Sequence, residues 1–133
     1  MKAVMCAGTF DFIHPGHLYF LSEAKKHGDR LIVVVARDDT SKYFKGKPPI
    51  HNEKERLEAV RTLEIVDQAI LGKHGNIFNI IEEIMPDVIC LGYDQNVQKQ
   101  QLEDELKKRE IKAEVIRIGS YMPHMYKSSK MQK

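Results

Sequence analysis

The sequence predicts a doubly wound α/β fold, in which helices cover both faces of a parallel sheet of about five strands. Short runs that are apolar on both faces alternate along the chain with segments of helical periodicity, and this alternation is typical of such sheets. The length of 133 residues suits a single domain over residues 1–133. The expected strands are residues 3–7, 31–36, 66–71, 87–91 and 113–118.

Four helices are expected between these strands, and boundary residues mark three of them. Pro15 suits a first helical turn, and Gly28 suits a C-terminal stop. Asn52 followed by Glu55 has the pattern of a capping box, and Pro86 closes an isoleucine-rich apolar face. The expected helices lie within residues 15–28, 52–63, 77–84 and 97–109.

The composition argues against two broad functional classes. Acidic and basic residues are mixed along the chain and leave a formal net charge of +2, whereas nucleic-acid binders usually concentrate basic residues. No apolar run approaches the roughly 18 residues that a membrane span needs, and the start lacks a secretory signal pattern. We therefore expect a cytoplasmic protein that binds neither nucleic acid nor membrane. Cys6 and Cys90 each end an apolar run and are expected to be buried, not metal ligands.

The densest cluster of polar residues follows the first expected strand, which is where open α/β sheets bind their ligands. Residues 8–17 read GTFDFIHPGH. Gly8 permits close backbone approach, and Gly16 keeps the helix start free of a side chain, so that the first-turn amides can face a phosphate. His14 and His17 are three residues apart and should project to the same side. There their imidazoles can donate hydrogen bonds to phosphate oxygens.

This stretch resembles the signature of the HxGH nucleotidyltransferase superfamily. That superfamily includes glycerol-3-phosphate cytidylyltransferase, the phosphocholine and phosphoethanolamine cytidylyltransferases and archaeal-type FAD synthase. The HxGH element is met by residues 14–17, and the resemblance covers nearly the whole chain, which implies a Rossmann-like sheet. Further similar segments are Arg37-Asp38-Asp39, Lys45 to Ile50, Glu55-Arg56 and Leu91 to Gln95.

The resemblance implies roles for individual residues. His14 and His17 would bind the triphosphate and stabilise the transition state, and Lys45 or Lys47 would reach the phosphates from the loop between residues 42 and 50. Asp11 and Arg56 are each open to two interpretations: substrate contact, or a structural role as a turn cap and an ion-pair partner respectively. The remaining nucleotide contacts are expected from Gly8, Thr9, Phe10, Pro15, Gly16, Asp94, Tyr121, Ser128 and Ser129.

The reaction implied by the resemblance is direct attack of an acceptor phosphate on the α-phosphorus of a nucleoside triphosphate. Mg²⁺ would accompany the leaving pyrophosphate, and no covalent enzyme intermediate is implied. These small relatives commonly pair, so a homodimer is expected.

The last segment indicates which member of the superfamily is nearest. The cytidylyltransferases follow their last strand with an Arg-Thr-Glu-Gly-Ile-Ser-Thr-Thr-like motif, whereas this chain has Arg117-Ile118-Gly119-Ser120-Tyr121. The sequence therefore favours ATP and FMN as substrates and FAD synthase as the function. Cytidylyl transfer to glycerol 3-phosphate or another alcohol phosphate, a sugar-phosphate nucleotidyltransferase and a non-catalytic nucleotide-binding regulator remain alternatives. A Rossmann oxidoreductase is disfavoured, because no G-x-G-x-x-G follows the first strand.

Overall fold

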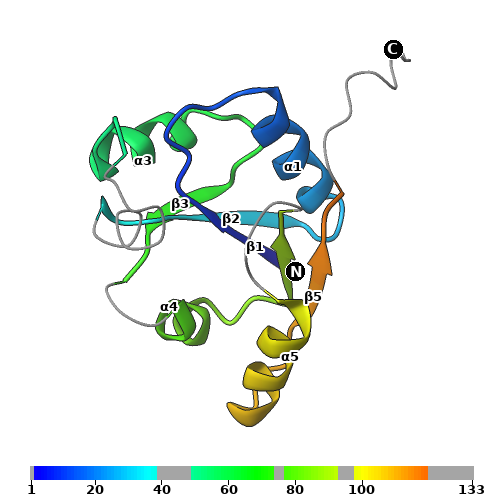
Figure 1. Cartoon of the computed structure of the whole chain (residues 1–133). Coiled ribbons are helices and arrows are strands. Elements are labelled where there is room, and N and C mark those ends of the chain that lie inside the picture. The colour runs from blue at the N-terminus through cyan, green and yellow to red at the C-terminus, as the bar shows by residue number, and fades with distance from the viewer. Residues whose placement is uncertain (1, 39–48, 74–76, 93–97, 120–133) are drawn as a thin grey trace.

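The computed structural model describes residues 2–38, 49–73, 77–92 and 98–119, and strands alternate with helices as predicted (Figure 1). The element boundaries agree with the expected ones to within a few residues. The elements are β1 (Ala3–Gly8), α1 (Pro15–Lys25), β2 (Arg30–Val35), α3 (Glu53–Arg61), β3 (Gln68–Leu71), α4 (Ile77–Ile84), β4 (Val88–Leu91), α5 (Lys99–Lys108) and β5 (Glu114–Arg117).

The sheet has five parallel strands in the order β3-β2-β1-β4-β5. The chain runs outward from β1 to β3 and then returns to the other side of β1, which confirms the predicted doubly wound topology. The reversal falls between β1 and β4. In such sheets, the crevice beyond the carboxyl ends of these two strands is the usual ligand site.

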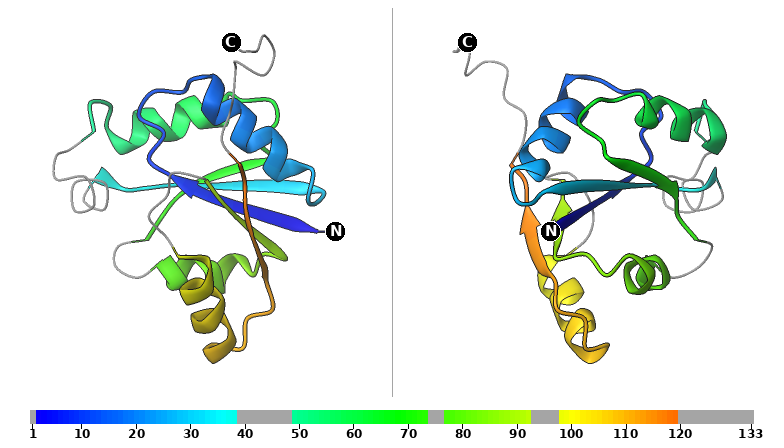
Figure 2. Two further views of the ribbon diagram at one scale, coloured as in Figure 1. Left: turned by 45° about the vertical axis from the view of Figure 1, so that its right-hand side comes forward. Right: turned by 180° about the vertical axis from the view of Figure 1, so that it is seen from behind.

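Two helical layers enclose the sheet, with α1 and α3 on one face and α4 and α5 on the other (Figure 2). On the first face, Leu21 of α1 and Val60 of α3 share a core with Val33 and Val35 of β2. On the second, Ile81 of α4 and Leu106 of α5 pack against β4 and β5. Burial on both faces explains why the strands read as continuous apolar runs. No helix in the described part of the chain is long and apolar enough to cross a membrane.

The two cysteines are buried, as predicted. Cys6 of β1 lies directly opposite Cys90 of β4 in the sheet register, and both belong to the core under α1 and α3. Their shared hydrogen bond and burial raise the pKa of Cys6 well above its usual value, so this thiol stays protonated in the core.

Candidate active site

Two histidines cap the start of α1. His14 is the N-cap residue, with an extended backbone at φ −133° and ψ 173°. Its Nδ1 accepts a hydrogen bond from the Gly16 amide at 3.1 Å. In return, Nδ1 of His17 accepts from the His14 amide at 3.3 Å. Together they form a capping box, a pattern usually made by a Ser or Thr and a Glu or Gln.

This capping arrangement fixes which nitrogen of each ring carries the proton. A backbone amide can only donate, so the accepting Nδ1 of His14 and of His17 is unprotonated, and the neutral ring holds its proton on Nε2. The two rings stack with centroids 4.0 Å apart. The prediction that both imidazoles lie on one side of the helix start is therefore confirmed, and their Nε2–H groups are the donors that a phosphate requires.

Two glycines make room for the aromatic rings of this site. A Cβ on Gly16 would lie 2.8 Å from Cε1 of His14, and a Cβ on Gly8 would lie 2.9 Å from Cε2 of Phe10. Phe10 has a left-handed backbone, with φ of 55°, and its buried ring packs 5.3 Å from the ring of His17. Phe10 therefore supports His17 through its side chain, while the expected contact of its backbone with nucleotide stays a prediction.

Asp11 ties the loop after β1 to the start of α3. We call residues 9–14 the motif loop. The carboxylate of Asp11 accepts from the Ile50 and His51 amides, each at 2.8 Å, and Nδ1 of His51 lies 2.9 Å from the Asp11 carbonyl oxygen. Desolvation acts to raise the pKa of Asp11, but these hydrogen bonds together lower it, so the carboxylate stays ionised. The turn that follows is capped by His14, not by Asp11.

Arg56 fastens the carboxyl ends of β1 and β2 together from within the core. Its side chain is completely buried, and its Nη1 donates to the carbonyl oxygens of Thr9 at 2.8 Å and Ala36 at 2.7 Å. Nη2 pairs with Asp38 at 2.7 Å, and Nε donates to the His51 carbonyl at 3.0 Å. The structure thus gives Arg56 the ion pair that was one of its two expected roles, while contact with substrate stays a prediction.

Of the remaining predicted site residues, some are described by the structure and others are not. Pro15 occupies the first helical position, as predicted, and Thr9 holds the carbonyl that Arg56 contacts. Sequence reasoning did not identify the link from Arg37 to Glu53 at 3.2 Å, which joins the end of β2 to α3. The expected site residues Lys45, Lys47, Asp94, Tyr121, Ser128 and Ser129 lie outside the described residues.

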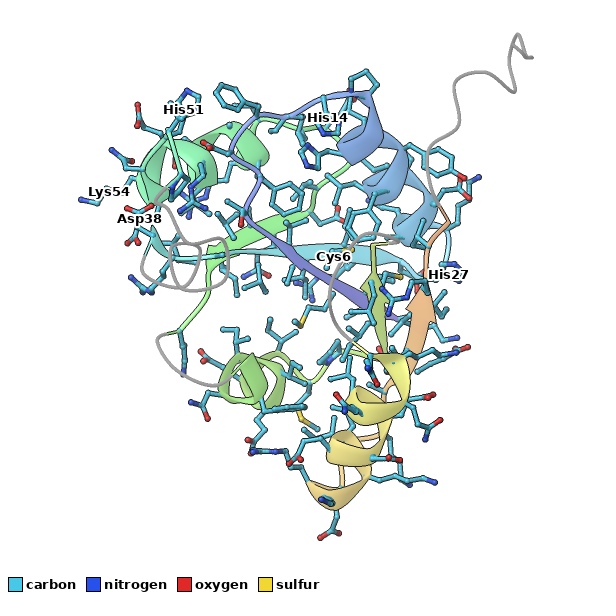
Figure 3. All side chains as sticks on the ribbon, in the orientation of Figure 1. Cys6, His14, His27, Asp38, His51 and Lys54 are labelled. Atoms are coloured by element: carbon cyan, nitrogen blue, oxygen red, sulfur yellow. The ribbon has the colours of Figure 1, made fainter. Side chains whose placement is uncertain are left out.

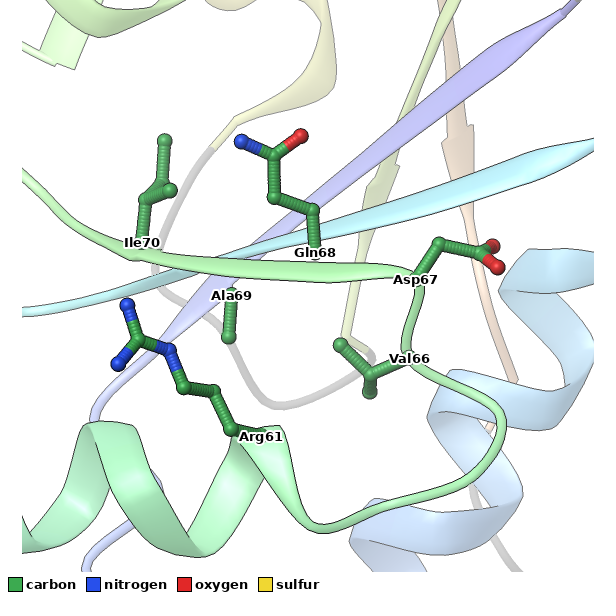
Figure 4. Close-up of a pocket in the computed structure, with 6 residues that line it drawn as sticks. All are labelled: Arg61, Val66, Asp67, Gln68, Ala69 and Ile70. Carbon is green, nitrogen blue, oxygen red and sulfur yellow. The ribbon is translucent and has the colours of Figure 1, made fainter.

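Two cavities border these elements, and they differ in position. One of about 230 Å³ lies between the motif loop and α3. The other, of about 390 Å³, lies at the start of the edge strand β3, where Arg61 reaches toward the strand (Figure 4). Only the smaller cavity is next to the capping histidines in the chain, on the side of the sheet where parallel strands end. The motif loop is therefore the candidate active site, with His14 at the start of α1 and His51 beside α3 (Figure 3).

Comparison with known proteins shows the family of this chain. A family model described as cytidylyltransferase-like matches residues 5–132, which covers every described element apart from the first two residues of β1. An FAD synthase of Ferroglobus placidus is 56% identical over 119 residues, covering 89% of this chain and 76% of the relative. An FAD synthase of Methanohalophilus mahii is 46% identical, covering 93% of this chain and 84% of the relative.

A solved structure is also similar over nearly its whole length. It is the crystal structure of a protein from Thermoplasma volcanium described as a lipopolysaccharide core biosynthesis protein. It is 43% identical, with a TM-score of 0.89, and the match covers 92% of this chain and 99% of that one.

Proposed function

Because this chain belongs to the cytidylyltransferase-like family, we propose that it transfers the adenylyl group of ATP to FMN, releasing pyrophosphate and forming FAD. The chain is a nucleotidyltransferase by its family and its relatives. The choice of substrates rests on the names of those relatives. The observation in the structure that supports the transfer chemistry is the pair of Nε2–H donors that His14 and His17 hold side by side at the start of α1.

The proposed step is a direct displacement at phosphorus. A phosphate oxygen of FMN forms a bond to the α-phosphorus of ATP, and the bond from that phosphorus to the β-phosphate bridging oxygen breaks. The negative charge that develops on the phosphate oxygens is stabilised by the Nε2–H groups of His14 and His17 and by the positive end of the α1 dipole. Rings stacked at 4.0 Å in fixed orientations need little rearrangement to donate to those oxygens.

We propose that Mg²⁺ reaches the site on the triphosphate. The motif loop does not fit a cation well: Asp11 is its single carboxylate, and that group already accepts three hydrogen bonds from Ile50 and His51. The histidine donors suit phosphate oxygens, and no step is assigned to the cation.

The experiment that tests this proposal offers the purified protein each of four nucleoside triphosphates, with Mg²⁺, against a panel of phosphorylated acceptors. Pyrophosphate release is measured and the products are identified by chromatography and mass spectrometry. FAD from ATP and FMN is the expected product. Formation of CDP-glycerol from CTP and glycerol 3-phosphate without FAD would overturn the substrates but not the chemistry. Binding of nucleotide without turnover would indicate a regulator.

One second candidate has a specific observation in its favour. The solved structure from Thermoplasma volcanium has a name that refers to lipopolysaccharide core biosynthesis, which suggests a sugar phosphate as acceptor. The same assay decides, because a sugar 1-phosphate in the acceptor panel would then yield a nucleotide sugar.

We further propose that the protein is a cytoplasmic homodimer. In the described sheet, β3 and β5 are edge strands, so each has one side without a strand partner within this chain. Light scattering at micromolar concentration tests the dimer, and a monomer mass would remove it.

A further inference from the structure

One large aromatic side chain in the motif loop is exposed. Phe12 is 55% exposed although it lies only two residues before His14, and Ile50, whose amide donates to Asp11, is 77% exposed. Single exposed apolar residues are common, but these two are brought together by Asp11, which holds the backbone of residues 50 and 51 against the loop. The result is a preformed apolar surface at the edge of the active site.

The ring of Phe12 is held in place by His51. The two rings meet edge to face, with centroids 4.8 Å apart and an interplanar angle of 76°. His51 is in turn bound by Asp11 through both its backbone and its ring. We call the edge-to-face pair of Phe12 and His51 the aromatic corner. Because the two side chains are already ordered, stacking a planar ring on the aromatic corner costs little additional side-chain entropy.

The cavity of about 230 Å³ lies against this corner. It is lined by residues 11–13 of the motif loop and by His51, Glu55, Arg56 and Ala59. Pockets for whole ligands usually measure roughly 300–1,000 Å³. This cavity is smaller, so it suits one ring system of a larger ligand whose remaining part extends toward the helix start.

The hydrogen bonds of His51 add a polar preference. Both oxygens near its Nδ1, the carbonyl and the carboxylate of Asp11, can only accept. Nδ1 therefore carries the proton, and Nε2 of the neutral ring is an acceptor. An aromatic ligand with an N–H on its edge matches such a group, and the isoalloxazine ring of a flavin has an imide N–H of this kind.

On this geometry, and resting on the proposed function, we propose that Phe12 and His51 form the subsite for the isoalloxazine ring of FMN. Phe12 and His14 are two residues apart, so their Cα atoms lie within roughly 7 Å. The ribityl chain of FMN spans a comparable distance between ring and phosphate. A ring held at Phe12 thus leaves its phosphate near His14 and His17, where the α-phosphate of ATP is expected.

Kinetics of the Phe12→Ala variant test the subsite. Loss of the stacking surface should raise KM for FMN by about ten-fold or more, while KM for ATP stays within about two-fold. Phe12→Trp keeps an aromatic face and should retain the FMN affinity. Met85→Ala is the matched control, because it removes another exposed apolar side chain, 58% exposed, at the end of α4 on the opposite face of the sheet.

Equilibrium binding separates this inference from the proposed function. Stacking quenches the fluorescence of FMN, so titration of FMN with wild-type and Phe12→Ala protein reports on the subsite without any transfer. If the wild type forms FAD and Phe12→Ala binds FMN equally well, the subsite is wrong and the function stands. If KM rises for ATP alone, adenine occupies the corner and the inference fails. If the wild type neither binds FMN nor forms FAD, both fail.

Discussion

The helices α1 and α3 cover the same face of the sheet, and both begin with a capping box. The two boxes differ in charge: the box of α3 contains an acidic residue, whereas the box of α1 contains none. In α3, Asn52 and Glu55 form the usual box, and Glu53 adds a second acid in the first turn. In α1 the box is made by His14, which accepts from the Gly16 amide, and by His17, which accepts from the His14 amide, and the first turn contains no acid. Both helices thus satisfy their first amides, while the net charge around those amides differs.

This difference indicates which helix start can take an anion. The positive end of a helix dipole favours negative charge close by. In α3 two glutamates of the helix itself already supply that charge. In α1 the two capping rings add no negative charge of their own, so a phosphate bound at this helix start would supply it. The identity of the residue at the third helical position therefore separates a structural helix start from a functional one.

Converting α1 to the pattern of α3 should have the largest effect. We predict that His17→Glu retains a capping box and lowers kcat by more than about 1,000-fold, because a donor is lost and a carboxylate faces the phosphates. An acid in the first turn stabilises a helix by about 0.3–1 kcal/mol, so the melting temperature should hold or rise. Steady-state kinetics and thermal unfolding measure the two effects. An active His17→Glu enzyme would contradict the comparison.

The two roles of His14 can be separated by a pair of variants. His14→Asn and His14→Ala should each lower kcat by about 100- to 1,000-fold, because both remove the Nε2–H donor. Asn is a good N-cap and Ala is not, so only His14→Ala should lose about 1 kcal/mol of unfolding free energy. Urea unfolding of the two variants decides this. Equal stability losses would show that the Gly16 hydrogen bond does not contribute to the fold.

A substitution at Gly16 tests whether the exact position of the His14 ring affects the rate of the reaction. We predict that Gly16→Ala lowers kcat by about 100-fold, since the new Cβ meets the His14 ring at 2.8 Å and must displace it. Gly119→Ala is the matched control, because no atom of the described residues lies within 4 Å of a Cβ built there. If both variants behaved like wild type, the exact position of the His14 ring would not limit the reaction.

The sequence predicts much of this comparison but not all of it. The strands, the helices and the Asn52–Glu55 box follow from local patterns, in which each residue's neighbours in sequence determine its role. A histidine capping box departs from the usual residue preferences, so the motif suggested a phosphate site without indicating the exchange of hydrogen bonds between His14 and His17.

The contacts that the sequence could not specify join residues far apart in the chain. Arg56 reaches Thr9, which is 47 positions away, and Asp11 reaches His51, which is 40 positions away. A charged residue on a helix is normally assigned to the surface, and the burial of Arg56 becomes intelligible only when the carbonyl oxygens of Thr9 and Ala36 meet beside it. Local sequence patterns do not indicate which residues distant in the chain will be in contact.

Asp11 connects the two helix starts, and its titration should have the smallest effect. Its pKa in the folded protein is lowered, so the ionised carboxylate stabilises the fold fully above the unfolded pKa of about 3.9. That contribution is lost as the pH falls through the folded value. We predict that Asp11→Asn lowers the free energy of unfolding by about 1 kcal/mol at pH 7, because an amide oxygen accepts more weakly than a carboxylate.

The difference in the free energy of unfolding between wild type and Asp11→Asn should therefore shrink as the pH falls below about 4, because the wild-type carboxyl then also loses its charge. Asp67→Asn is the matched control. The pKa of Asp67 is likewise lowered, chiefly by its hydrogen bond from Lys25 and then by that from the Leu31 amide, so its variant should show the same trend with pH. Asp67 precedes β3 and pairs with Lys25 at the carboxyl end of α1, away from both helix starts, so only Asp11→Asn should also weaken FMN binding. Urea titrations across this range decide the point. A stability difference for Asp11→Asn that stayed constant with pH would mean that its carboxylate does not hold the motif loop to α3.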